Sequence, residues 1–299
     1  MLKGVMVTKI TEINIRDPYI LPHDGKYYLY GTRSETCWGE ADGFDCYVSD
    51  DFENWDGPTE IFHRPDGFSA NQNYWAPECI YRDNEFYLVT TFGFSDRKKG
   101  IYVLKSENPT GPFELYSERI TPENWSCIDG TVYFHESRPY LIFSHSFEDN
   151  PNGDMCILEM SGDLKSAISE PKLLFSAAEA KWAMPVPFAK AEFGMDGDVY
   201  FTDGPSLMKM SDGKLYMTWS SWSECGYAVG VAVSESGDPC GEWKQLDTPL
   251  FPENGGHGML FKDTDNIKFT LHFPNDKYKE RPIIRKVFLN DGKLILEEE

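Results

Sequence analysis

The sequence predicts an all-β protein, a five-bladed β-propeller with four-stranded antiparallel blades, and three observations support this prediction. Aromatic residues make up 15% of the 299 residues, Gly and Pro are frequent, and segments with helical periodicity are scarce. One pattern recurs five times: an acidic or polar residue beside Pro or Gly, a short apolar strand, a turn and an aromatic-rich strand. Several copies continue into a third strand and then a Gly-Pro-Phe or Gly-Glu-Trp segment, which indicates an outer fourth strand.

The five copies follow one another along the whole chain, at residues 17–32, 75–92, 128–147, 202–222 and 256–273. Asp24-Gly25, Asp83-Asn84 and Asp212-Gly213 are typical hairpin turns within them. We expect a single propeller domain over residues 1–299, in which the N-terminal MVTKITEI and the C-terminal RPIIRKVFLNDGKLILEE pair within one blade to close the ring. A β-sandwich or a β-helix is the alternative architecture.

In a propeller, the innermost strand of every blade lines the central channel, so residues at the start of these strands converge on one opening. Asp17, Glu78, Asp129, Asp203 and His257 are predicted to hold equivalent positions in the five repeats. The architecture would therefore bring them together around one axis although they are far apart in the sequence.

Several carboxylates in one pocket repel one another, which raises at least one pKa. A protonated acid beside an ionised base is the arrangement that glycoside cleavage requires. The same residue types also cap turns, as in the Asp-Pro and Asp-Gly pairs of this chain, so each acid taken alone is a weak signal.

Composition limits the classes of partner. The formal net charge is −21, and the longest basic cluster is Arg97-Lys98-Lys99, so neither a nucleic acid nor a membrane is an expected partner. The seven cysteines are odd in number and lack metal-ligand spacing. The first residues lack the apolar core of a signal peptide, so we expect a cytoplasmic protein, or a secreted one if a signal peptide has been removed from this sequence.

The ordered motifs resemble glycoside hydrolase family 43, a family of five-bladed, inverting furanosidases and xylosidases. The resemblance implies that Asp17 in IRDPYIL is the general base and that Asp129 in CIDGTVYF orients the acid and adjusts its pKa. The family motif Trp-Ala-Pro-Asp/Glu is matched by Trp75 to Glu78. The usual Glu-Gly-Pro motif of the acid is replaced by TDGPSLMK, and this form resembles a branch that uses Asp, which implies that Asp203 is the acid. A degenerate, non-catalytic site is the competing interpretation.

Substrate-binding roles are expected for several further residues. Trp75 would form an apolar wall against the sugar, and Glu78, His145 and Arg281 would contact hydroxyl groups, although each also fits strand packing or a salt bridge. His257 in GGHGML is also expected to bind substrate, and it resembles an axial histidine that holds a water or a structural Ca²⁺ in the central channel; a histidine between glycines also fits a plain turn. No cofactor is expected to be required. Trp38, Phe94 and Trp222 follow second repeat strands and either shape the rim or pack between blades.

Together these expectations describe an inverting glycoside hydrolase that acts on an oligosaccharide or glycoside. Terminal α-L-arabinofuranosides are favoured, followed by β-D-galactofuranosides, and xylosides are also compatible. The alternatives are a retaining fructan-type furanosidase and a non-catalytic sugar-binding propeller. The sequence does not determine the number of subunits.

Overall fold

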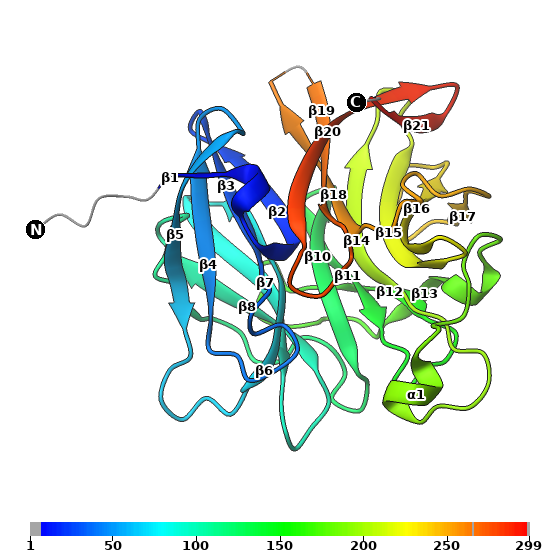
Figure 1. Cartoon of the computed structure of the whole chain (residues 1–299), viewed down its shortest axis with the longest axis horizontal. Helices are drawn as coiled ribbons and strands as arrows, with labels where there is room; N and C mark the ends of the chain where they lie inside the picture. Colours follow the sequence, from blue (N-terminus) through cyan, green and yellow to red (C-terminus); the bar gives the residue numbers. More distant parts are fainter. Residues whose placement is uncertain (1–6, 265, 298–299) are drawn as a thin grey trace, which may run out of the picture.

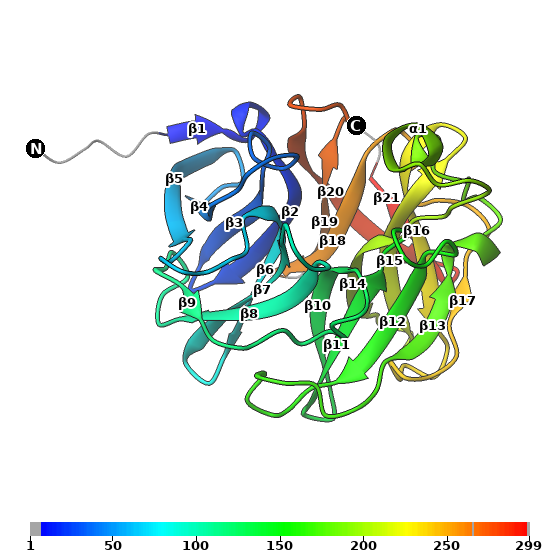
Figure 2. The same cartoon turned by 90° about the horizontal axis from the view of Figure 1, so that it is seen from below.

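The alternation of short apolar strands with tight turns gives the predicted β architecture. The computed structural model describes residues 7–264 and 266–297. Within these residues, five antiparallel sheets surround a central axis (Figures 1 and 2). The predicted five-bladed propeller is therefore confirmed. No helix of the described part is long and apolar enough to cross a membrane.

The blades are numbered in chain order, and each runs from an inner to an outer strand. Blade one contains β2 (Ile15–His23), β3 (Lys26–Arg33), β4 (Gly43–Ser49), β5 (Asn54–His63) and the added outer strand β1 (Val7–Lys9). Blade two contains β6 (Gln72–Arg82), β7 (Glu85–Gly93), β8 (Gly100–Ser106) and β9 (Glu114–Leu115). Blade three contains β10 (Cys127–His135), β11 (Arg138–His145), β12 (Asp154–Glu159) and β13 (Lys172–Ser176).

The second half of the ring repeats this order. Blade four contains β14 (Asp203–Lys209), β15 (Leu215–Ser223), β16 (Gly226–Ser234) and β17 (Lys244–Gln245), and blade five contains β18 (Gly256–Asp263), β19 (Asn266–Phe273), β20 (Arg281–Asn290) and β21 (Lys293–Leu296). The connection between blades three and four carries the 3-10 turn η2 (Ala177–Glu179) and the short helix α1 (Ala189–Phe193). The 3-10 turn η1 (Ile10–Glu12) links β1 to β2.

The hydrophobic core lies between the blades rather than at the axis. Successive blades enclose one cluster of buried apolar side chains each, for example Tyr30 and Phe44 of blade one against Tyr74 and Leu88 of blade two. Similar clusters fill the next three interfaces. Burial of apolar surface therefore fixes each blade against its neighbours, which is what positions the inner strands.

The ring closes differently from the sequence prediction, which was wrong about the termini. The N-terminal strand β1 pairs with β5 in blade one, whereas β20 and β21 complete blade five. The C-terminal hairpin supplies the outer strand of its own blade, so no strand from the N-terminus is needed there. Closure instead comes from packing, because Met259 and Phe261 of blade five are buried against Ile15, Ile20 and Trp55 of blade one.

Candidate active site

Every inner strand carries a β-bulge near its start, at the end that lines the central opening. Each blade has a bulge residue with a positive φ, namely Asp17, Ala76, Asp129, Gly204 and His257, and β6 has a second one, Asn73, in an earlier bulge. Left-handed backbone is uncommon for residues other than Gly and concentrates at functional sites. The bulges therefore define which residues are equivalent in the ring.

This register corrects the predicted equivalence of five residues. Asp17, Asp129 and His257 do hold the same position. Asp203 lies one residue before the bulge of its strand, and Glu78 lies two residues after Ala76 of blade two. A bulge inserts an extra residue into a strand and re-aims the side chains around it, so sequence alignment of the motifs alone did not reveal the offset.

The bulges are tied to the preceding blade by a repeated hydrogen bond. The inner-strand residue just before each of the five equivalent bulges pairs with a residue of the second strand of the same blade. That second-strand residue is a Thr, Ser or His in all five blades: Thr32, Thr91, Ser144, Ser220 and His272. The amide of Asp129 donates to Thr91 Oγ1 at 2.9 Å, and the amide of Asp17 donates to His272 Nδ1 at 3.2 Å. Ala76 and His257 repeat this bond with Thr32 and Ser220, while Ser144 donates to the carbonyl of Thr202. We call this set the inter-blade ring.

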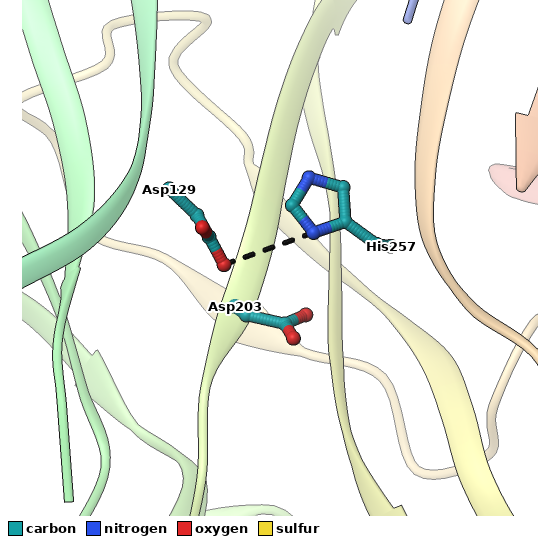
Figure 3. Close-up of side chains that lie close together, drawn as sticks. All are labelled: Asp129, Asp203 and His257. Atoms are coloured by element: carbon teal, nitrogen blue, oxygen red, sulfur yellow. Dashed lines mark ion pairs between the residues drawn. The ribbon is translucent and has the colours of Figure 1, made fainter. Parts of the chain in front are cut away.

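The structure brings the three predicted catalytic carboxylates and His257 together in one pocket of about 680 Å³. His257 Nδ1 lies 3.5 Å from Asp17 Oδ1 and 3.7 Å from Asp129 Oδ2. The nearest oxygens of Asp129 and Asp203 and a ring nitrogen of His257 all lie within 4.8 Å of one another, and Figure 3 shows these side chains pointing toward a common point.

Asp17 is the ionised member of this group. Burial alone would raise its pKa, but the nearby His257 and Arg16 and a 2.6 Å hydrogen bond from Thr32 Oγ1 to Asp17 Oδ2 outweigh burial. The net result is a pKa below the ordinary value of an Asp. A carboxylate of this kind is available to accept a proton at neutral pH.

Asp203 is the opposite case. Burial raises the pKa of Asp203 to about 8, although the hydroxyl of Tyr227 donates to Asp203 Oδ2 and works against this rise. The other oxygen, Oδ1, is buried and has no hydrogen-bond partner. Because Tyr227 occupies Oδ2, Oδ1 is the oxygen left to carry the proton.

Asp129 is also held in its protonated form. Burial is the main reason why its pKa rises to about 8, and Asp203 and Asp17 add like-charge repulsion. Asp129 and Asp203 are close enough to titrate as a coupled pair. These shifts favour the protonated forms of Asp129 and Asp203 at neutral pH and the ionised form of Asp17.

The model of glycosyl hydrolases family 43 matches residues 9–293. The chain belongs to this family.

The names of similar proteins refer to enzymes for several different sugars. An endo-arabinase from Bacteroides thetaiotaomicron is 32% identical, with a TM-score of 0.86, and the match covers 97% of this chain and 100% of that one. An endo-1,4-beta-xylanase structure from the same organism is 25% identical, with a TM-score of 0.76 and coverage of 99% and 97%. A curated relative, alpha-L-arabinofuranosidase 43 of Humicola insolens, is 22% identical over 88% of this chain, which spans about half the length (55%) of that relative.

Not every predicted contact residue of this family 43 member reaches the pocket. Trp75 does line it, and its indole N–H donates to the Cys37 carbonyl at 2.8 Å. Glu78 lies outside the lining, buried beside Thr131 and Asp129, and burial raises its pKa to about 8.

His145 and Arg281 also lie outside the pocket lining. His145 stacks on Trp125 with a centroid separation of 4.0 Å and pairs with Asp149 at 2.9 Å. Arg281 donates to the carbonyls of Thr11 and Glu280. Local partners therefore occupy both side chains, and their places give no support to the predicted sugar contacts.

Three residues that sequence reasoning did not select complete the site. Arg16 lines the pocket, forms a 2.7 Å ion pair with the fully buried Glu280, and donates to Asn275 at 2.9 Å. His272 Nδ1 accepts a hydrogen bond from the Asp17 amide. Burial and the nearby Arg16 charge hold the pKa of His272 well below its ordinary value, so the imidazole is neutral. Tyr227 binds Asp203 and stacks on His272.

A sequence signal existed for two of these. Arg16 directly precedes Asp17, and His272 occupies the position that is Thr or Ser in the other four repeats.

The residues described around His257 offer few direct ligands for the structural calcium ion that the resemblance implies. Calcium prefers six to eight oxygen ligands, whereas the cluster found within the described residues offers two carboxylates and one imidazole. No step of the reaction at Asp17 and Asp203 requires a metal.

Proposed function

We propose that the chain hydrolyses terminal α-L-arabinofuranosyl linkages with inversion of configuration. The observation that carries this proposal is the division of roles in one pocket, where Asp17 is ionised and Asp203 holds a proton. The choice of arabinofuranose is supported by the names of two relatives, an endo-arabinase and an alpha-L-arabinofuranosidase. β-D-Galactofuranosides and xylosides rank after it.

The reaction follows from the protonation states. Asp17 accepts a proton from a water molecule, and the water oxygen forms a bond to the anomeric carbon. The bond from this carbon to the glycosidic oxygen breaks, and Asp203 donates its Oδ1 proton to that oxygen. After turnover Asp17 is protonated and Asp203 is ionised, and exchange with solvent restores both.

Asp129 assists without exchanging a proton with the substrate. It is protonated at neutral pH and lies within reach of both Asp203 and His257. A neutral neighbour adds no charge that would hold the departing proton on Asp203.

The pocket size is compatible with terminal cleavage. A volume of about 680 Å³ is within the range of about 300–1,000 Å³ that pockets for small ligands occupy. Such a pocket holds a few sugar rings, which is suited to removing a unit from the end of a chain.

A panel of nitrophenyl furanosides and pyranosides, followed by an anomer-resolved NMR time course, tests the proposal. We expect turnover of the α-L-arabinofuranoside with inversion, and losses of several orders of magnitude in kcat/KM for Asp17→Asn, Asp129→Asn and Asp203→Asn with the fold intact. Retention of configuration would instead make Asp17 a nucleophile, as in fructan-type furanosidases. Sugar binding without turnover on any substrate would indicate a non-catalytic propeller.

A further inference from the structure

Trp38 presents an exposed indole at the edge of the catalytic pocket. It lies in the loop between β3 and β4 and lines the same pocket as Asp17 and Asp203. Its relative exposure is 51%, which is high for a residue of this size. Leaving so much aromatic surface in water is unfavourable unless another group covers it.

The indole is held in place without any ligand. Its ring packs against the Trp75 ring at a centroid distance of 5.8 Å and an angle of 67°, and the Arg16 guanidinium lies 5.2 Å from its centroid. Arg16 is itself fixed by the buried Glu280.

The loop that carries Trp38 is equally fixed. Trp75 donates to the carbonyl of Cys37, the residue just before Trp38. The amide of Ala41 donates to the carbonyl of Asn71 in the segment that leads into blade two. A rigid platform loses little entropy when a ligand binds to it, so these contacts favour recognition by a preformed surface.

The surroundings of Trp38 suit a sugar ring. The indole offers an apolar face for the C–H groups of a sugar, and polar side chains of the same wall, Gln72 and Asn73, can bond hydroxyl groups. Trp38 and the carboxylates line one continuous pocket, so a ligand bound at the carboxylates can extend onto the indole.

We propose that Trp38 is the stacking platform for the second sugar unit of the substrate, next to the unit held at Asp17, Asp129 and Asp203. This inference rests on the proposed function, because it takes the occupant to be a short arabino-oligosaccharide. Oligosaccharides of two or three units then bind more tightly than arabinose, and the difference depends on the indole.

Calorimetric binding to an Asp203→Asn protein tests the platform, because this variant binds substrate without consuming it. Adding Trp38→Ala is expected to weaken arabinotriose about tenfold and to leave arabinose unchanged, while Trp38→Phe keeps most of the affinity. Phe288→Ala is the matched control, because Phe288 is similarly exposed at 49% but lies outside the pocket lining, and it should change neither affinity.

The outcomes separate the two proposals. Unchanged arabinotriose binding in Trp38→Ala, or an equal loss for both sugars, would overturn the platform alone, since an equal loss indicates damage to the whole pocket. No binding of either sugar by the Asp203→Asn protein, together with turnover of a different glycoside by the wild type, would overturn the arabinofuranoside assignment and the platform with it.

Discussion

Replacing Tyr227 by Phe should move the alkaline limit of activity to higher pH. The Tyr227 hydroxyl donates to Asp203 Oδ2, and this bond stabilises the ionised form of the acid. Phe retains the ring that packs on His272 at a centroid distance of 5.7 Å, so the change is confined to one hydroxyl group. Without this donor, burial acts on Asp203 unopposed by Tyr227, and its pKa rises further above about 8.

The size of the shift follows from the hydrogen bond. A bond to a charged group contributes about 1.5–3 kcal/mol, and about 1.4 kcal/mol corresponds to one pKa unit. We therefore expect the midpoint of the alkaline limb of kcat/KM to shift to higher pH by about one to two units. The acid limb, which reports Asp17, should stay in place and serves as the internal control.

The assay is the pH dependence of kcat/KM on arabinotriose, whose poor leaving group makes the acid step necessary. At pH 6 to 7 Asp203 is protonated in both proteins, so the variant should retain most of its activity there. An alkaline limb that stays in place or moves to lower pH would refute the assignment of Asp203 as the acid.

Two further predictions concern stability. Asp203→Asn should melt at a higher temperature than the wild type at pH 8. The folded-state pKa of Asp203, about 8, exceeds the unfolded value of about 3.9, so the wild type loses stability as the pH rises between these values. Thermal unfolding at pH 4 and pH 8 checks that the difference in melting temperature between the two proteins narrows at acid pH. Glu280→Gln should lower the free energy of unfolding by about 3–5 kcal/mol, because it breaks a buried ion pair with Arg16. It should also move the acid limb of kcat/KM to lower pH, since the Arg16 charge is then balanced by Asp17 alone. Asp247→Asn, which removes an exposed partner of Lys181, is the control and should leave the melting temperature nearly unchanged.

The fold was predictable because its units repeat. Each repeat contains its own hairpin turn and aromatic strand, so five weak local signals gave one architecture. The termini were less predictable because both flanking segments have strand character. Whether β1 joins blade one or blade five depends on which outer edge is free, which is a property of the assembled ring.

The site was predictable only in part. The Asp-Pro and Ile-Asp-Gly motifs located Asp17 and Asp129, but an inserted bulge residue leaves no mark in hydrophobic alternation, so Glu78 was assigned to the wrong register. The position of His145 depends on Trp125, a loop residue whose approach cannot be read from the strand pattern.

The opposite behaviour of two identical side chains was beyond sequence reasoning. Asp17 and Asp203 are both buried, yet the pKa of one falls and that of the other rises. Asp17 has the cation Arg16 next to it in the chain, and His257 reaches it from 240 residues away. Asp203 accepts a hydrogen bond from the Tyr227 hydroxyl of the same blade, which lowers its pKa. Burial in the assembled ring has the larger effect, so the pKa of Asp203 rises.

The inter-blade ring makes catalytic competence a collective property. Because each bulge is anchored by the blade before it, a carboxylate on one sheet is aimed by a side chain from another. A fragment of blades one to four would contain all three acids but would lack His272, the anchor of the Asp17 amide. All five anchors lie on the second strand of their blades, so substitutions in the two outer strands leave the aim of the carboxylates intact.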